Sequence, residues 1–492
     1  MKKKLQEVPF FFILLPLFFV LHGYAENFRS LRVADCLALA GAYLLMAVVL
    51  FALSWLLFRN SIKAALLTTF ILSFYFFFGA LHDFLVAQHI ILHKYSLLLP
   101  LFLLTTILLI VYLKRRNSFS PLPLFLNALF LIYLVVDLAS LALGITGRDS
   151  VKSTPYAQVE RSFKPCDSCA RPDIYFLLFD GYSSSKTLKE NYHYDNSGLD
   201  SFLTGEGFRI QKDSRSNYFM TMFSMTSMLN LSYLANCPEN IGSEDFTNLI
   251  GPLRDNEVTR FLSARGYSIV NNSIFDLAGH PSTIDQPFIP TRTKLITSRT
   301  LINYIVRDMG KWLTEHFVTA ERYYNNVYHT NEQLLTQTLE ESKKAPAAPR
   351  FVYTHLLLPH FPHLFDSLQH RRATKDVVAD KEVVRLEPYL NYLPYTNARI
   401  KELISTIKKN SGGKAVIIFM SDHGFRHYPG GPVDERPFFY NQNAIYLPDR
   451  DYRLFYDSMS AVNEFRVLFN TLFRQDLPLL KDSTIFLKGG GF

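Results

Sequence analysis

The chain has 492 residues, too many for one small domain, and its composition is uneven. Hydrophobic residues make up 49% and charged residues 19%, but almost all of the long apolar runs lie before residue 145. The formal net charge of +8 does not indicate nucleic-acid binding, because basic residues gather in short clusters between the apolar runs and no basic stripe interleaved with aromatic residues follows them. A membrane region followed by a water-soluble region is therefore expected.

Five apolar runs are long enough, or nearly so, to cross a membrane, at 8–24, 36–58, 64–85, 95–113 and 121–144. Basic clusters at 2–4, at Arg59 with Lys63 and at 114–116 are typical of cytoplasmic loops. Starting inside, five crossings place everything after residue 144 outside. The first run also resembles a cleavable signal peptide, because lysines precede it and Gly23-Tyr24-Ala25 ends it. Cleavage would leave four spans and the same orientation.

Two acidic residues lie within these runs. Asp83 and Asp137 are both placed toward the outer end of a predicted span. Ionisable groups at membrane depth are costly, so each carboxylate either reaches the water at the interface or borders a cleft for a lipid substrate.

Beyond the membrane region, polar residues with Pro155 and Pro165 predict a linker at 148–172. Short apolar runs predict strands at 173–179, 351–357, 415–420 and 444–447, and helical patterns cover 304–341 and 397–409. Strands separated by helices indicate a mostly parallel sheet with helices on both faces. The expected fold class is thus a five-helix transmembrane domain at 1–147, the linker, and an α/β/α sandwich at 173–492.

In such sheets the functional site lies beyond the carboxyl ends of the strands. The first predicted strand runs into Asp180, and the third runs into Asp422 and His423, followed by Gly424. Two carboxylates and one imidazole are suitable ligands for one divalent metal ion, Zn²⁺ or Mn²⁺. An Asp-His pair alone is more often only a hydrogen-bonded turn, but its match with Asp180 favours a metal site.

A nucleophile should lie near that ion. Thr221 opens the apolar stretch 221–234, which predicts a buried helix, and a helix N-terminus attracts phosphate. A threonine oxygen bound to a metal would be activated without a separate base. Thr221 could instead be a simple helix N-cap, and Ser224 is an equal candidate on this evidence.

Histidines follow the second predicted strand. His355, His360 and His363 lie within nine residues, and His427 follows Asp422 by five. Histidine can hold a phosphate oxygen or protonate a leaving group, so these four are candidates for substrate binding. A solvated histidine-rich loop is the alternative.

The linker contains a C-x-x-C pair, Cys166 and Cys169. On the outer, oxidising side of a membrane this pair favours a disulfide. A zinc site would need two further ligands that the linker lacks, and no thioredoxin-like pattern surrounds the pair.

Taken together, these motifs resemble the alkaline phosphatase superfamily, and within it the sulfatase-like membrane proteins. That branch includes the phosphoethanolamine transferases that modify lipid A and the lipoteichoic acid synthases. The resemblance covers the whole chain. It rests on the T-x-x-S pattern at 221–224, the H-x4-H pair at 355 and 360, the D-H-G turn at 422–424 and the first-strand acid at 180.

The resemblance implies a role for each residue. Thr221 would be the nucleophile and His360 would act on the substrate and its leaving group. One divalent metal would be held by Asp180, Thr221, Asp422 and His423.

Two departures from the family pattern matter. No C-x-P-x-R or S-x-P-x-R sequence occurs, which argues against a formylglycine-dependent sulfatase, and the segment CPEN at 237–240 has the wrong spacing. The residues at 361–363 also differ from the glycine-rich version of the transferases, which leaves the substrate open.

The leading hypothesis is a metal-dependent transferase in the bacterial inner membrane with its catalytic domain in the periplasm. It would move a phosphoethanolamine or phosphoglycerol head group from a phospholipid to Thr221, and then to an envelope lipid or glycan. With water as acceptor the same site would be a phosphodiesterase or phosphatase. A non-catalytic envelope assembly or sensor protein on the same fold is the third possibility.

Overall fold

A computed structural model describes residues 8–28, 31–116, 119, 121–146, 163–166, 168–235, 237–277, 279–284, 293–306, 320–345, 347–381, 385–426 and 434–489. The chain divides into two compact units, the first made of Met1–Ser150 with Pro290–Phe317 and the second of Val151–Ile289 with Val318–Phe492. The division expected from the sequence placed residues 290–317 in the soluble domain. The structure instead assigns this segment to the first unit.

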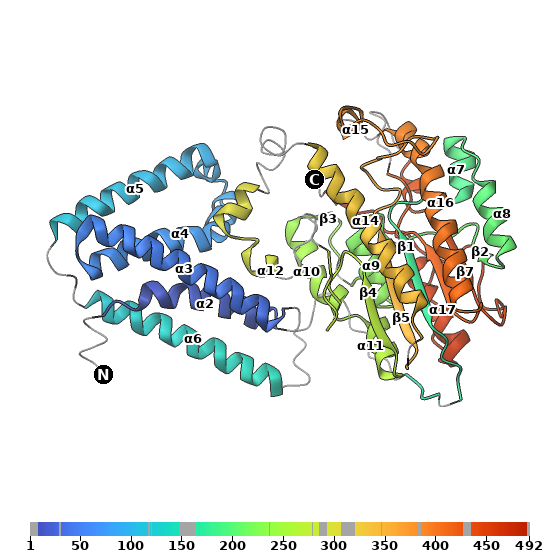
Figure 1. Ribbon diagram of the computed structural model, residues 1–492, viewed down its shortest axis with the longest axis horizontal. Helices are drawn as coiled ribbons and strands as arrows, with labels where there is room; N and C mark the ends of the chain where they lie inside the picture. Colours follow the sequence, from blue (N-terminus) through green and yellow to red (C-terminus); the bar gives the residue numbers. More distant parts are fainter. Residues whose placement is uncertain are drawn as a thin grey trace. The chain divides into compact units, whose positions relative to one another are not determined.

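The first unit is a bundle of apolar helices (Figure 1). Four of them are long and apolar enough to cross a membrane, and the helix over the first predicted span has only 16 residues. Many of their large apolar side chains point outward, such as Leu103, which is 62% exposed. Such a surface suits lipid rather than water. The helices are α2 (Phe11–Glu26), α3 (Val33–Phe58), α4 (Ser61–Ala87), α5 (Tyr95–Arg115) and α6 (Leu122–Thr146), with the short η1 (Ile91–His93) and α12 (Lys294–Thr297).

Both acidic residues of the predicted spans have partners inside this unit. Asp137 is buried and lies 3.0 Å from Nδ1 of His22. Asp83 accepts hydrogen bonds from the hydroxyl of Tyr304, which belongs to the segment from beyond residue 290.

The second unit is built on a mixed sheet in the order β2-β7-β6-β1-β5-β4. Strand β1 pairs in parallel with β5 and β6, and β4 pairs in parallel with β5. Strand β7 runs antiparallel to β6, and the edge strand β2 pairs antiparallel with β7. Strands β1, β5 and β6 are completely buried, as expected for central strands, and β1 and β6 are continuous apolar runs. The strands are β1 (Ile174–Phe179), β2 (Arg209–Ile210), β4 (Ser268–Asn272), β5 (Arg350–Leu356), β6 (Val416–Met420) and β7 (Asn443–Tyr446).

The α/β class with a mostly parallel sheet is confirmed, and all four predicted strands are present within a residue or two. The sequence analysis missed β2 and β4, which are short or carry polar residues. The helix predicted at 304–341 is helical wherever it is described, at 304–306 in the first unit and in α14 (Ala320–Lys343), and residues 307–319 lie outside the described residues. The helix predicted at 397–409 is longer and forms α16 (Leu386–Asn410).

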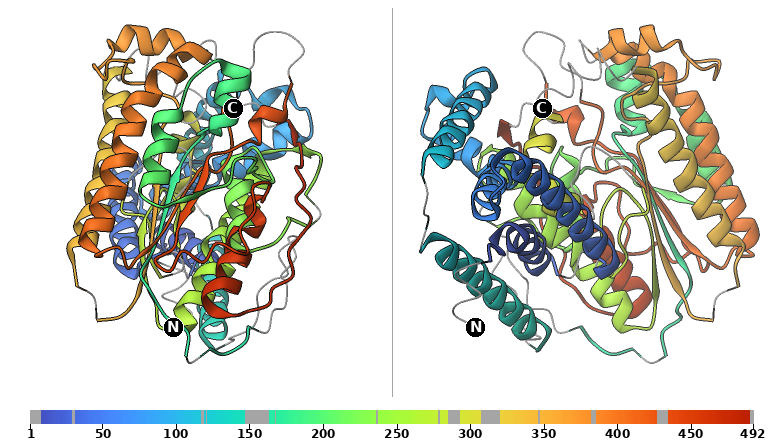
Figure 2. Two further views of the ribbon diagram at one scale, coloured as in Figure 1. Left: turned by 90° about the vertical axis from the view of Figure 1, so that its right-hand side faces the viewer. Right: turned by 60° about the vertical axis from the view of Figure 1, so that its left-hand side comes forward.

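Helices cover both faces of this sheet (Figures 1 and 2). One face carries α14 and α16, and the other carries α9 (Thr221–Leu229), α11 (Glu257–Ala264) and α17 (Ala461–Phe473). Amphipathic patterns turn the apolar side of these helices toward the strands. The remaining elements are α7 (Ser185–Tyr192), α8 (Ser197–Gly205), α10 (Ser243–Arg254), α15 (Thr374–Lys381), η2 (Arg436–Phe438) and a small parallel pair of β3 (Asn240–Ile241) with β8 (Lys488–Gly489).

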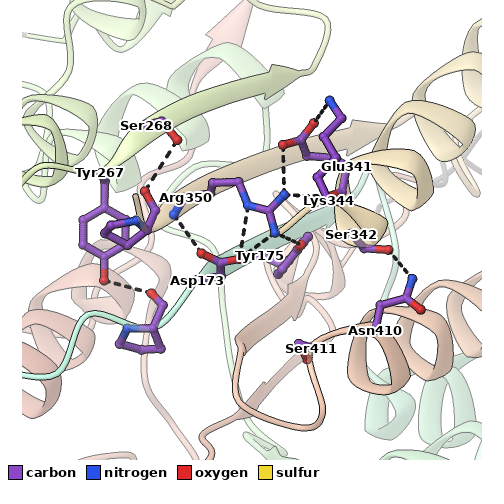
Figure 3. A network of polar contacts seen from close by, with 12 residues as sticks. Asp173, Tyr175, Tyr267, Ser268, Glu341, Ser342, Lys344, Arg350, Asn410 and Ser411 are labelled. Atoms are coloured by element: carbon purple, nitrogen blue, oxygen red, sulfur yellow. Dashed lines mark hydrogen bonds and ion pairs between the residues drawn. The ribbon is translucent and has the colours of Figure 1, made fainter. Parts of the chain in front are cut away.

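An arginine at the start of β5 ties the amino end of the sheet together (Figure 3). The guanidinium of Arg350 donates to Asp173 at 2.7 and 3.1 Å and to the carboxylate of Glu341 at 3.0 Å. Its backbone N–H donates to Asp173 as well, at 2.9 Å. This network joins the start of β1, the start of β5 and the end of α14.

The predicted disulfide is present between Cys166 and Cys169, whose Cα atoms lie 5.5 Å apart. Most of the remaining predicted linker lies outside the described residues.

Candidate metal centre at the carboxyl ends of the strands

Two neighbouring strands deliver the acidic groups of the site. Strand β1 ends at Phe179 and is followed by Asp180, and the parallel strand β6 ends at Met420, two residues before Asp422. One ligand atom from each of Asp180, Asp422 and His423 lies within 4.8 Å of the others, and all three residues are buried. The structure thus brings together the three side chains that the sequence analysis placed at one ion.

The loops after the two strands hold each other in place. Gly181 adopts a φ of +73°, which a side chain would strain, and its N–H donates to Oδ1 of Asp422 at 3.0 Å. The next N–H, from Tyr182, donates to Oγ of Ser421 at 2.8 Å. Oγ of Ser421 in turn donates to the carbonyl oxygen of His423 at 2.7 Å. Gly181 and Ser421 are positioning residues that the sequence analysis did not assign, although a glycine directly after a strand-end aspartate is a detectable signal.

One oxygen of each carboxylate is left for a ligand. Oδ1 of Asp180 and Oδ2 of Asp422 are buried and have no hydrogen-bond partner among the described residues. A buried, unpaired carboxylate oxygen is costly, so two that converge need a positive charge between them. This donor set fits a divalent cation.

His423 is oriented to complete that set. Its Nδ1 lies 2.7 Å from the carbonyl oxygen of Gly424, so Nδ1–H donates there and Nε2 presents its lone pair to the site. That Nε2 is 3.3 Å from Oδ2 of Asp422 and 3.7 Å from Oδ1 of Asp180. Burial lowers the pKa of His423, which outweighs the opposing effect of Asp422 and keeps the ring neutral, as a ligand must be.

Asp180 is held in its charged form. Burial alone would raise its pKa, but His360 nearby and the hydrogen bond from His355 outweigh burial and hold the pKa well below its usual range. A carboxylate that stays ionised is ready to bind a cation.

Thr221 is the first residue of α9, and its hydroxyl faces the same point. Its Oγ1 lies 3.3 Å from Nε2 of His423. The N-cap position belongs to Met220, which makes no side-chain cap, so the simple capping role weighed for Thr221 does not apply. At the start of a helix, Thr221 lies where free N–H groups favour an anion.

Ser224, the rival candidate one turn along α9, is 1% exposed. Its Oγ donates to the backbone carbonyl of Asp422 at 2.7 Å, so the hydroxyl is engaged in holding the metal loop. Thr221 is therefore the hydroxyl that remains open to a substrate.

The predicted substrate histidines separate into two groups. His360 is only partly buried, and a side chain at Gly181 would meet its ring at 3.9 Å and that of His423 at 3.7 Å, so both rings flank the Gly181 turn. Its Nδ1 lies 2.8 Å from the carbonyl oxygen of Phe361, so Nε2 is the ring nitrogen that remains for contact with a substrate. His427 lies outside the described residues.

His355 and His363 form the second group, which is buried, and their predicted contact with substrate stays a prediction. His355 is fully buried, with Nδ1 2.9 Å from the hydroxyl of Tyr353 and Nε2 3.5 Å from Oδ2 of Asp180. Its contact with Asp180 helps to hold that carboxylate in position. His363 is 3% exposed and packs against aromatic rings, and burial lowers its pKa to about 3.

The second unit presents two carboxylates, an imidazole and a hydroxyl at the carboxyl edge of a mostly parallel sheet, as expected from the resemblance to the alkaline phosphatase superfamily. A sulfatase family model matches residues 180–449, more than half of the 492-residue chain. The chain therefore belongs to the sulfatase family, whose enzymes hydrolyse or transfer sulfuryl or phosphoryl groups.

Solved structures with a similar fold include two bacterial periplasmic domains. The C-terminal periplasmic domain of EcEptC from Escherichia coli is 14% identical with a TM-score of 0.39, over 63% of this chain and 84% of that one. The C-terminal periplasmic domain of phosphoethanolamine transferase EptC from Campylobacter jejuni is 13% identical with a TM-score of 0.38, over 62% and 90%. The phosphonate monoester hydrolase of Agrobacterium radiobacter is 12% identical with a TM-score of 0.37, over 61% and 74%. No curated protein sequence matches the chain.

Proposed function

We propose that this protein is a membrane-bound, metal-dependent phosphotransferase that carries a phospholipid head group on Thr221. The observation that carries the proposal is the position of the Thr221 hydroxyl, 3.3 Å from Nε2 of His423, at the point where Asp180 and Asp422 direct their unpaired oxygens. Zn²⁺ or Mn²⁺ is the proposed ion, since both accept oxygen and nitrogen ligands.

The bound metal would lower the pKa of a coordinated hydroxyl and neutralise charge on a phosphate. In the first half-reaction Oγ1 of Thr221 would lose its proton to water and form a bond to phosphorus, while the bond from phosphorus to the diacylglycerol oxygen breaks. His360 is placed to give the leaving oxygen a proton through Nε2, because its Nδ1–H is engaged with Phe361. The products are diacylglycerol and a phosphothreonine that carries the head group.

In the second half-reaction a hydroxyl of the acceptor attacks the same phosphorus, and the bond to Oγ1 of Thr221 breaks. His360, now neutral, takes the proton of the attacking hydroxyl. The acceptor is proposed to be an envelope lipid or glycan, and water in its place would give hydrolysis.

The membrane helices support a lipid donor, because a substrate dissolved in a bilayer is met most readily by an enzyme anchored there. We place the protein in the bacterial inner membrane with the catalytic unit in the periplasm. The basic clusters at Arg59 with Lys63 and at 114–116 favour this orientation.

The test uses the purified full-length protein with phosphatidylethanolamine and phosphatidylglycerol, each labelled in the head group, in separate reactions with Zn²⁺ or Mn²⁺. We expect label on the peptide that contains Thr221, release of diacylglycerol, and neither with Thr221→Ala. Label on the Ser224 position, or turnover without any protein adduct, would contradict the proposal. Adding a lipid A or glycan acceptor separates transfer from hydrolysis, since only transfer moves the label onto the acceptor.

A further inference from the structure

The segment 293–306 of the first unit is separated in sequence from the membrane helices by the whole first part of the second unit. The chain enters the second unit at Val151, returns to the first with Pro290–Phe317 and leaves again at Val318. Within this return, α12 and the helical residues 301–306 are described.

This segment packs into the bundle as part of its core. Ile296 is 6% exposed and belongs to the apolar cluster of α2, α3 and α4, where a side chain at Gly23 would meet it at 2.8 Å. Tyr304 is 3% exposed and belongs to a second cluster with Phe78 and Leu85 of α4. The segment is therefore packed into the bundle through two buried side chains and does not only lie on its surface.

Helix α4 departs from regular helical geometry where the segment contacts it. The helix is kinked at Phe77, and the N–H of Gly79 donates to the carbonyl oxygen of Arg299 at 2.9 Å. A side chain at Gly79 would come within 2.7 Å of that oxygen, so only glycine permits this approach. Because a free N–H is costly at membrane depth, the segment and the kink depend on each other.

The depth of the contact can be estimated along α4. Gly79 lies 18 residues after the first residue of this 27-residue helix, or about 27 Å along an axis of about 40 Å. A hydrocarbon layer of about 30 Å centred on the helix ends about 35 Å along it. The backbone of Arg299 thus meets α4 about 8 Å inside the membrane boundary, and Asp83, four residues further along α4, lies about 2 Å inside it.

The outward face of the segment is apolar. Ile302 and Val306, one helical turn apart, are 57% and 53% exposed, whereas Tyr304 between them is buried. Arg299, one turn before Ile302, is also exposed. A short helical stretch with aliphatic residues on its exposed side, preceded by an exposed arginine in the turn before it and held near the membrane boundary, has the features of an in-plane interfacial helix.

A polar contact secures the opposite side. The hydroxyl of Tyr304 donates to the carboxylate of Asp83, with oxygen distances of 2.7 and 2.8 Å. The ring of Tyr304 also lies edge-on to those of Phe78 and His82, at 5.7 and 5.5 Å between centroids. This contact accounts for an acidic residue near the end of an apolar helix.

We propose that residues 294–306 are a second membrane anchor, in which Ile302 and Val306 insert among the lipid acyl chains of the leaflet at the C-terminal end of α4. Arg299 faces the lipid phosphates, and the Asp83–Tyr304 contact holds the helix at that depth. The second unit would thus be connected to the membrane twice, once through the helices that precede it in the chain and once through residues 294–306. The proposal does not depend on the reaction that the protein catalyses.

The test places a fluorescent nitrobenzoxadiazole label at Ile302→Cys or Val306→Cys of the full-length protein in phospholipid vesicles. Cys36 and Cys237 are first replaced by serine, since they are the free cysteines. Lipids brominated near the head group should quench both labels strongly, and lipids brominated near the chain ends should quench them less. A label at Leu103→Cys, in the middle of α5, should show the reverse order. Labels at 302 and 306 that no brominated lipid quenches, or that deep bromines quench best, would overturn the proposal.

The contact with Asp83 is tested in the Ile302→Cys protein. Tyr304→Phe keeps the ring but removes the hydroxyl, and we expect shallow quenching to fall by half or more as the helix loosens. Tyr133→Phe, which removes a hydroxyl from an exposed tyrosine of α6, should leave the quenching unchanged. Equal quenching in the two variants would show that the Asp83 contact does not hold the segment.

Discussion

The two ends of β1 both carry buried or partly buried carboxylates, but the carboxylates are satisfied in different ways. At the amino end, Asp173 and Glu341 are paired with one guanidinium, that of Arg350 (Figure 3). At the carboxyl end, Asp180 and Asp422 each keep a buried oxygen without a hydrogen-bond partner in the described part of the chain.

This difference separates a structural charge cluster from a functional one. A buried charge is stable only when it is paired and hydrogen-bonded. The chain supplies the whole partner set at the amino end, so that network has no need of a ligand. At the carboxyl end the partner must come from solution, which is what a metal site requires.

The largest expected effect lies at the carboxyl end. Thr221→Ala removes the atom that we propose attacks phosphorus, so turnover of phospholipid should fall about 10³-fold or more. The unfolding temperature should hardly change, because among the described side chains this hydroxyl contacts only His423. Head-group release by the purified protein, measured beside its unfolding curve, checks both. Near-normal turnover would remove Thr221 from the reaction.

The amino end should respond in stability instead. Arg350→Met keeps an apolar stem but leaves Asp173 with only the backbone N–H of residue 350 and Glu341 with only Lys344, so the free energy of unfolding should fall by about 3 kcal/mol. Arg453→Met is the matched control, because Arg453 also pairs with an aspartate but its side chain is 86% exposed, and it should cost less than about 1 kcal/mol. Similar losses for the two variants in denaturant titrations would mean that burial of the network does not matter.

Glu464 is a buried carboxyl that, among the described residues, has one hydrogen-bond partner and no cation beside it, so its contribution to the free energy of unfolding should depend on pH. Glu464 is fully buried, accepts a hydrogen bond from Asn443 at 2.8 Å, and burial raises its pKa to about 7. Since the folded state binds this proton more tightly than the unfolded state, the stability that it contributes is complete below pH 4.5 and is lost as the pH rises to 7. Glu464→Gln should therefore be more stable than the wild type by up to about 3 kcal/mol at pH 8 and equal to it at pH 4.

Unfolding curves at the two pH values measure this difference. The control is Glu402→Gln, whose carboxylate is half exposed and should show no such dependence. A Glu464→Gln difference that is the same at both pH values would assign the effect to packing rather than to the proton.

A metal ion bound at the carboxyl end should raise the free energy of unfolding. Removal of one carboxylate there should not lower the stability of the metal-free protein. At about 100 times its dissociation constant, Zn²⁺ or Mn²⁺ should raise the free energy of unfolding by about 2.7 kcal/mol, and a chelator should reverse this. Asp422→Asn should abolish the rise, yet without metal it should be at least as stable as the wild type, because two converging carboxylates become one. A loss of stability in metal-free Asp422→Asn like that of Arg350→Met would erase the distinction between the two ends.

The smallest effect should come from the positioning residue on α9. Ser224→Ala removes a hydrogen bond to the backbone oxygen of Asp422 and should cost about 1 kcal/mol in stability and about tenfold in turnover. Ser227→Ala is the control, since its Oγ makes an equally short bond of 2.7 Å to the carbonyl of Ser232. The control should lose similar stability and no activity, and equal turnover in the two variants would deny Ser224 any role at the site.

The central strands and the membrane helices could be predicted from the sequence because each is specified by its own composition. Continuous apolar runs of six or seven residues are typical of buried strands, and apolar runs near 20 residues are typical of spans. The meeting of Asp180 with Asp422 also followed from the sequence, since carboxyl ends of parallel strands share one edge of a sheet. In these cases local pattern and a general rule of the fold suffice.

Other features depended on packing between residues far apart in sequence. The sequence could not separate His355 from His360. His355 lies within β5 and contacts Asp180, whereas His360 lies beyond the end of that strand. The residue pattern by itself left Thr221 and Ser224 equal, the family resemblance favoured Thr221, and the packing of the loop that carries Asp422 against α9 separates their contacts. Likewise, the assignment of residues 293–306 to the membrane unit rests on the contact of Tyr304 with Asp83, 221 positions away. No local periodicity contains such information, because the energy that decides each position comes from the partner and not from the segment itself.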